Sequence, residues 1–303
     1  MGLNSLRRGW TLTRDAAGLW LDCNAFGHAG ALAFYTLFSL APVVIIAVTV
    51  IGLVFGEVAA QGQIVAQLSG LMGTEAAQAV QRAVAQSRIQ ESGPLPSLLG
   101  VGALVVGATT VFAQMQYSLN TVWGVAARPG RSSLWVFLKN RLLSLTVVLV
   151  IGFVMLVSLL AGVVLRALLH FTHQFVPAVA ALLGGAELML SWLATALLFG
   201  AIFKVLPDVV LRWRDVVVGA LVTATLFAVG RYGIAAYLAY TATASTYGAA
   251  GSVVLILLWV YYSSLILLFG AAFTRTHLEA RGLAVVPRNS AVRVRHELVT
   301  ESR

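Results

Sequence analysis

The feature that most constrains this chain is a series of six long apolar stretches, separated by loops that carry arginine and lysine. A helix needs about 20 apolar residues to cross the roughly 30 Å hydrocarbon core of a bilayer, and each stretch reaches that length. Only 10% of the residues are charged, whereas soluble domains average about 25%. The sequence therefore predicts an all-α, polytopic membrane protein, and every candidate function has to operate in a bilayer.

The hydrophobic pattern predicts where the chain crosses the membrane. The six expected spans are residues 29–55, 95–117, 142–169, 184–206, 216–240 and 251–274. They form a transmembrane domain over 29–274, preceded by an N-terminal helical segment, 1–28, and followed by an arginine-rich tail, 275–303. The tail is polar, so we expect it to be mobile and cytoplasmic.

The longest loop expected outside the cell interior lies between the first two spans. Apolar and small residues recur there at helical spacing over 57–93, interrupted by Gly70 and Gly73. Thr74 and Glu75 resemble a helix start. We expect an amphipathic helical hairpin, which either lies on the outer surface or covers the mouth of a cavity.

The distribution of basic residues predicts the orientation. Sixteen of the 20 Lys and Arg residues fall in the N-terminus, the second-to-third loop, the fourth-to-fifth loop and the tail. Since basic loops stay in the cytoplasm, both termini are expected there, in a bacterial inner (plasma) membrane. This sidedness also accounts for the net charge of +9, so nucleic acid is not an expected partner. Membrane lipids are the expected partners, and a protein could dock on the basic cytoplasmic face.

The N-terminal segment combines basic and aromatic side chains. Three arginines and four large apolar residues occur close together there: Arg7, Arg8, Trp10, Arg14, Leu19, Trp20 and Phe26. Such a composition suits a helix in the headgroup layer. A juxtamembrane helix packed against the bundle fits equally well, and the two interpretations are compatible.

An arginine inside a predicted span is the main candidate for a functional site. Ionisable residues in a bilayer are costly and usually functional. Arg231 lies well inside the fifth span, and the alternating topology puts Glu187 in the same outer half of the membrane. Either Arg231 pairs with Glu187 along a cavity, or the fifth span ends early and Arg231 reaches the outer interface.

Three further residues are expected beside such a path. Arg141 begins the third span, where it would meet a lipid phosphate or a carboxylate, and Ser245 and Tyr247 belong to a hydroxyl-rich turn before the sixth span. The small residues of 248–252 favour close helix packing there, with non-helical backbone lining a cavity as the alternative.

Charges and a proline mark two other positions. Near the inner end of the fourth span, a loop charge network is predicted from Lys204, Asp208, Arg212, Arg214 and Asp215. We expect it to fix the inner boundary rather than to bind a ligand. Pro42 lies inside the first span and removes a backbone donor, which predicts a helix kink, without a gating role.

The sequence shows no motif typical of an enzyme. Cys23 is the single cysteine, which leaves no intrachain disulfide and no thiolate cluster. His170 and His173 lack a third metal ligand nearby, and no Walker, Rossmann or G-x-S-x-G motif occurs. No metal, cofactor or catalytic residue is therefore expected.

Several short motifs, taken in order, resemble the YihY/BrkB family of membrane proteins. They are LAFYTLFSLAP (32–42), LNTVWGV (119–125), RLLS (141–144), LPDVVLRWRDV (206–216), LFAVGR (226–231), STYGAAGS (245–252) and LWVYYSSLILLFGAAFT (258–274). The resemblance implies a six-helix inner-membrane protein. Members have carried ribonuclease and serum-resistance labels, and some are linked to export of lipid A precursors or other lipids. Where the family usually has G-A-E-F, this chain has alanine, Ala272, at the acidic position.

Three functions remain open at this point. The first is a transporter or flippase for a lipid or amphipathic molecule, which would need a cavity open sideways to the bilayer. The second is a scaffold or accessory subunit, which would have a dry, packed core. The third, an enzyme acting on RNA or a lipid headgroup, lacks a nucleolytic metal site and a soluble RNA-binding module.

Overall fold

Helices dominate the computed structural model, which describes residues 2–55, 62, 78, 81, 94–128, 177–240 and 249–294. The helices are α1 (Gly2–Asp22), α2 (Ala25–Phe55), α5 (Pro94–Trp123), α7 (Pro177–Val205), α8 (Trp213–Tyr240) and α10 (Ala249–Ala280). Two short strands, β1 (Val125–Ala127) and β2 (Ala291–Arg293), pair antiparallel. The all-α prediction did not include this sheet.

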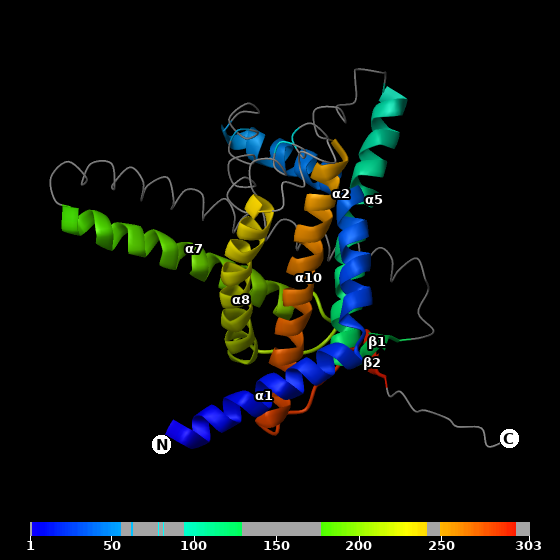
Figure 1. Cartoon of the computed structure of the whole chain (residues 1–303). Coiled ribbons are helices and arrows are strands. Elements are labelled where there is room, and N and C mark those ends of the chain that lie inside the picture. Colours follow the sequence, from blue (N-terminus) through cyan, green and yellow to red (C-terminus); the bar gives the residue numbers. More distant parts are fainter. Residues whose placement is uncertain are drawn as a thin grey trace.

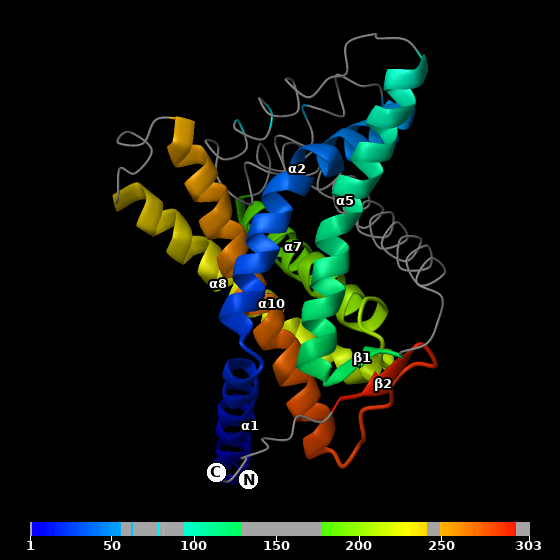
Figure 2. The same ribbon diagram turned by 90° about the vertical axis from the view of Figure 1, so that its right-hand side faces the viewer.

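Helix α10 is the centre of the arrangement. It packs against α1, α2, α5 and α8, and α2, α5, α8 and α10 run through one bundle (Figures 1 and 2). Helix α7 packs mainly against α8 and slants away from the bundle (Figure 1). The start of α1, the lower ends of α8 and α10, and the sheet all lie at one end of the molecule, here called the sheet end.

Five predicted spans coincide with helices. Helices α2, α5, α7, α8 and α10 cover the first, second, fourth, fifth and sixth expected spans within a few residues. Within the described part of the chain, three segments are long and apolar enough to cross a membrane: Leu188–Val205, Trp213–Ile234 and Ile256–Ala280. The third expected span, 142–169, and almost all of the hairpin, 57–93, lie outside the described residues.

Among the side chains that the structure describes, the apolar core lies toward the sheet end. Trp123, Phe203 and Leu268 are at most 1% exposed there and belong to one apolar core. Elsewhere, large apolar side chains face outward, such as Leu197 on α7 at 52% and Val229 on α8 at 66%. Apolar surface on this scale is unusual in a soluble monomer and is what a helix presents to lipid.

The crossing of α8 and α10 depends on two glycines. A methyl group at Gly219 would collide with Oγ1 of Thr274, and one at Gly270 would collide with Oγ1 of Thr223. Each threonine also donates its hydroxyl hydrogen to the carbonyl four residues earlier on its own helix, both at 2.6 Å. The two Gly-x-x-x-Thr segments therefore interlock, which is how small residues bring membrane helices close together.

Helix α2 contains the predicted proline. It runs from Ala25 to Phe55 as one helix, and both ribbon views show it bent into two arms near its middle (Figures 1 and 2). Pro42 lies close to the midpoint of this range in the sequence. Proline removes one helical hydrogen bond and pushes away the preceding turn.

A tight turn joins α1 to α2. Asn24 adopts a left-handed conformation with φ of 51°, and its N–H donates to the Leu21 carbonyl at 2.9 Å. Asparagine tolerates this conformation better than most residues. The turn closes α1 and opens α2 within two residues, so the two helices are fixed relative to each other.

The thiol of Cys23 in this turn should react slowly with alkylating reagents. Burial raises the pKa of Cys23, and the nearby Arg275 opposes this only in part. At neutral pH the reactive thiolate is therefore scarcer than in an open peptide, and the alkylation rate should keep rising at pH values where an ordinary cysteine has levelled off. Maleimide labelling across pH, before and after unfolding in detergent, measures this. A folded protein that labels as fast as the unfolded one contradicts it.

The C-terminal segment differs from the mobile tail predicted over 275–303. Helix α10 continues to Ala280, and residues 285–294 fold back across the sheet end. Pro287 bridges to Val209, β2 pairs with β1, and the buried side chains of Val285 and Ala291 join the core. A polar composition suggested mobility, but backbone pairing and two anchoring side chains hold the segment. Residues 295–303 lie outside the described part.

Candidate functional site

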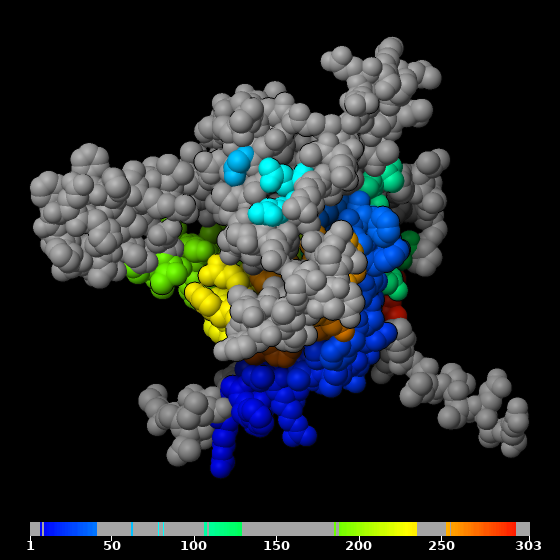
Figure 3. Space-filling model, turned by 45° about the horizontal axis from the view of Figure 1, so that its top comes forward, coloured from blue at the N-terminus to red at the C-terminus, as the bar shows by residue number. Residues whose placement is uncertain are grey.

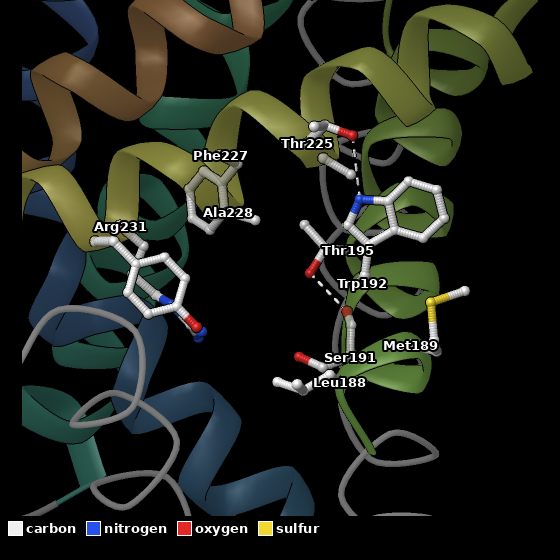
Figure 4. A pocket seen from close by; sticks show the side chains of 11 residues that line it. Leu188, Met189, Ser191, Trp192, Thr195, Thr225, Phe227, Ala228 and Arg231 are labelled. Atoms are coloured by element: carbon white, nitrogen blue, oxygen red, sulfur yellow. Dashed lines mark hydrogen bonds between the residues drawn. The ribbon is translucent and has the colours of Figure 1, made fainter. Parts of the chain in front are cut away.

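A pocket of about 500 Å³ opens between α7 and α8 (Figure 4). Its lining is predominantly apolar and contains one cation. The lining residues are Leu188, Met189, Ser191, Trp192 and Thr195 from α7, and Ala224, Thr225, Phe227, Ala228, Arg231 and Tyr232 from α8. Leu188 and Tyr232 at its edge are 63% and 62% exposed, so the pocket opens to the side of the helix pair.

Arg231 is the charged group of this pocket. The neighbouring Gly230 faces α10, where a methyl group would collide with the Tyr262 hydroxyl. This contact sets which side of α8 faces α10, and the next residue, Arg231, lines the pocket (Figure 4). The half-buried guanidinium lies 5.3 Å from the centre of the Tyr232 ring, a cation–π distance. Among the described side chains, no carboxylate forms an ion pair with Arg231.

Hydrogen bonds shape the rest of the pocket. The Trp192 indole N–H donates to Oγ1 of Thr225 at 3.3 Å and so joins α7 to α8. The Thr195 and Thr225 hydroxyls donate to carbonyls four residues earlier on their own helices. Because these three polar groups already have partners, the surface left for a ligand combines an apolar wall with the Arg231 cation and the hydroxyls of Ser191 and Tyr232.

Of the other predicted path residues, the structure describes only the backbone of Glu187. Leu188 lines the same pocket as Arg231, so the adjoining backbone of Glu187 lies in the part of α7 that faces it, but the Glu187 side chain lies outside the described residues. Arg141, Ser245 and Tyr247 lie entirely outside the described residues. The Arg231–Glu187 pair therefore stays a prediction.

At the sheet end, Asp208 in the α7–α8 connection bonds to both α5 and the C-terminal segment. Its carboxylate accepts hydrogen bonds from Gln116 at 3.2 Å and Asn120 at 2.9 Å on α5, and from Ser290 at 3.2 Å in the C-terminal segment. Its backbone N–H donates to the Asn120 side chain, and its carbonyl accepts from the Arg288 N–H. Amides and a hydroxyl surround this acid, in place of the neighbouring cations that the sequence suggested.

The five predicted inner-face charges do not form one network within the described residues. Lys204 donates to the Leu211 carbonyl at 3.0 Å and lies over the Trp213 ring, with no bond to Asp208. Asp215 caps the start of α8 by accepting from the Arg212 N–H at 3.0 Å, and it pairs with Arg281 at 3.3 Å. The side chains of Arg212 and Arg214 are exposed.

Arg288 was not singled out by the sequence, yet it closes the end of α7. Its guanidinium donates to the carbonyls of Lys204, Val205 and Val209, at 3.0 to 3.3 Å. The last carbonyls of a helix lack partners within the helix, and a planar donor fork can satisfy several of them at once.

Replacing Arg288 with methionine should lower the free energy of unfolding by roughly 2 kcal/mol, since three carbonyls lose a charged donor. Arg288→Lys should recover less than half of this loss, because an ammonium cannot reproduce the planar fork. Thermal unfolding in detergent measures both. Arg293→Met is the control, because Arg293 is exposed and takes part in the sheet through its backbone. Equal stability of the two methionine variants contradicts the assignment.

No metal site stands out in the described part of the chain. No three His, Cys, Asp or Glu side chains gather there as candidate ligands. Ala272, at the position where the resembling family has an acid, is fully buried in the apolar core, where an unpaired carboxylate would be costly.

The helices, their lipid-like exposure and the lateral pocket define an integral membrane protein. A model of the family described as Virulence factor BrkB matches residues 20–293, so the chain belongs to the YihY/BrkB family. It is 30% identical over 252 residues to a UPF0761 membrane protein of Chromobacterium violaceum, covering 81% of this chain and 57% of that protein. It is 26% identical over 268 residues to one of Alteromonas mediterranea, covering 86% and 87%.

A further relative is the UPF0761 membrane protein YihY of Escherichia coli, 28% identical over 187 residues, or 61% of this chain and 60% of that protein. The chain spans a little over half the length of the Tolumonas auensis and Chromobacterium violaceum relatives that it matches. No solved structure matches.

Proposed function

We propose that this protein moves a lipid or another amphipathic molecule within or across the bacterial inner membrane, through the pocket between α7 and α8. The observation that carries the proposal is the composition of that pocket. An apolar wall and one arginine face the side of the helix pair, where membrane lipid would be. A molecule with an acyl chain and an anionic headgroup complements both parts.

The proposed topology has six spans, with 142–169 as the third, and an inner face at the sheet end. The described basic residues support this orientation. Apart from Arg231, they belong to α1, the C-terminus of α7, the α7–α8 connection, the first turn of α8, the end of α10 and the strand region. Basic residues collect on the cytoplasmic side, so Arg231 belongs to the outer half of α8.

The energetic cost of an arginine in a span supports a functional role for it. A charge at the centre of a transmembrane helix costs about 3 kcal/mol even on insertion scales. No carboxylate among the described side chains compensates that cost at Arg231. A bound anionic headgroup would compensate the cost of the Arg231 charge. Because this compensation lasts only while the substrate is bound, it suits a site on a transport path.

The test is lipid translocation in proteoliposomes with Arg231 varied. Arg231→Ala should reduce the translocation rate of a fluorescent anionic phospholipid by about tenfold or more, the loss expected when a charge-assisted hydrogen bond worth roughly 2 kcal/mol disappears. Arg231→Lys should keep a substantial part of the rate, because it retains the charge.

Two controls separate transport from folding. Arg214→Ala removes an exposed cation outside the pocket and should leave the rate unchanged. Thermal unfolding of each variant checks that the bundle is intact. A folded Arg231→Ala protein that translocates lipid at the wild-type rate rules out the role given to this arginine.

A further inference from the structure

Helix α1 has two faces with different surroundings. Its inner face packs on α10: Ala16 is fully buried, the Trp20 indole N–H donates to the Leu265 carbonyl at 3.2 Å, and the Trp20 ring lies 6.3 Å from Phe269. These contacts hold the C-terminal half of α1 against the bundle, while the helix projects from the body of the molecule (Figure 3).

The opposite face carries a stripe of exposed cationic and apolar residues. Arg7, Trp10, Arg14 and Leu21 follow one another three, four and seven residues apart, which places them on one side of a helix. Trp10 is 71% exposed and Leu21 56%, and both arginines are exposed. Gly18 lies in the same stripe with open space around it. We call this set the outer stripe; the two exposed acids of α1, Asp15 and Asp22, lie beside it rather than within it.

The depth of α1 follows from its contacts with α10. Leu265 and Phe269 lie inside the apolar segment Ile256–Ala280, ten and six residues before its first charged residue, Arg275, or roughly 15 and 9 Å at 1.5 Å per residue. The Trp20 end of α1 therefore packs beside a part of α10 that lipid surrounds. A purely aqueous position for α1 conflicts with that contact.

We propose that the outer stripe of α1 is a lipid-binding surface embedded in the headgroup layer of the same membrane. Trp10 and Leu21 sit at the boundary with the acyl chains, and Arg7 and Arg14 contact the phosphates of anionic phospholipids. Charge complementarity selects this partner, because the stripe offers two guanidinium groups and no carboxylate. Aromatic and basic side chains on one helix face are typical of interfacial helices. This proposal does not depend on the transport function.

A nitroxide on α1 tests the proposal in the full chain. Cys23 is the single cysteine, so Cys23→Ser gives a background in which Gly18→Cys carries the label on the outer stripe. Gly9→Cys is the matched control, because Gly9 is also exposed, has open space around it, and lies on another side of the helix. Frequent collision of the nitroxide with oxygen indicates that it lies in lipid, and frequent collision with a water-soluble nickel chelate indicates that it lies in water. Nanodiscs of phosphatidylcholine are compared with nanodiscs that also contain phosphatidylglycerol.

The expected result is that the label at position 18 collides mainly with oxygen and the label at position 9 mainly with nickel. Phosphatidylglycerol should further lower the nickel collisions at position 18, and Arg7→Gln with Arg14→Gln should abolish this shift. Equal nickel access at both positions overturns the proposal. So does spin–spin broadening at position 18, which would assign the stripe to a second copy of the chain.

A second measurement keeps the proposal testable if the cysteine variants fold poorly. Brominated lipid quenches tryptophans at the acyl boundary, and Trp10→Phe should remove a quenched part of the emission. If Trp10→Phe removes only emission that brominated lipid does not quench, the stripe faces water and the proposal fails.

Discussion

Replacing Gly219 with valine should destabilise the helix bundle by roughly 3 kcal/mol, at the upper end of the cost of overpacking a filled interface. Any Cβ at this position would collide with Thr274 Oγ1, and the Gly270 carbonyl lies just behind it. Since α8 and α10 also interlock through Gly270 and Thr223, a shift at one contact disturbs the other. Thermal or denaturant unfolding in detergent measures the loss.

Gly233→Val is the matched control for Gly219→Val. Gly233 lies on the same helix, and a methyl group there meets nothing within 4 Å, so the cost should be small. A double variant, Gly219→Ala with Thr274→Gly, moves the bulk from one helix to the other and should recover part of the stability lost in Gly219→Ala. If the two valine variants unfold alike, the α8–α10 crossing is not as close as described.

Replacing Asp208 with alanine should cost about 3 kcal/mol, because a buried donor left without its acceptor costs roughly 1 to 3 kcal/mol. Gln116, Asn120 and Ser290 all lose the carboxylate. The C-terminal segment also loses one of its ties to α5 and the α7–α8 connection. Trypsin should therefore cut the segment containing Arg281 and Arg288 faster than in the unmodified protein.

Asp15→Ala serves as the control for Asp208→Ala, because Asp15 is an exposed acid on α1. It should change neither the unfolding transition nor the rate of cleavage. An Asp208→Ala protein as stable and as protease-resistant as the Asp15→Ala protein means that Asp208 does not hold the sheet end together.

The helices were predictable from the sequence because burial in lipid depends on length and composition, which are properties of a contiguous segment. Helix α8 agrees with its expected span within three residues at each end, Trp213–Tyr240 against 216–240, whereas α10 begins within two residues of its span but continues past the expected end at 274 to Ala280. The sheet was not predictable, since β1 and β2 have three residues each and pair across more than 160 positions of sequence.

The candidate site was predictable only in part. Arg231 was found because a charge inside an apolar run is conspicuous. Trp192 and Thr225 were not, because a tryptophan and a threonine in a span look like ordinary apolar or packing residues until α7 and α8 are placed together. At the sheet end, the i,i+4 spacing of Lys204 and Asp208 suggested a pair. Pro207 ends the helix between them, and each side chain then finds other partners.

Hydrogen bonds from two amides of α5 reach the α7–α8 connection rather than another helix. Gln116 and Asn120 carry such bonds to Asp208, although the partner could not be named from the sequence. The contacts of Arg288 and Ser290 were not predictable, because no local pattern signals that a polar segment will fold back on a distant helix end.

The central claim, that substrate passes between α7 and α8, is tested most directly by filling that pocket. Leu188→Trp places an indole at a residue that lines it, whereas Leu193→Trp places the same indole at an exposed position of α7 outside the lining. In proteoliposomes, Leu188→Trp should stop most of the lipid translocation, while Leu193→Trp should leave it near the unmodified rate. Equal rates for the two folded variants would contradict the claim.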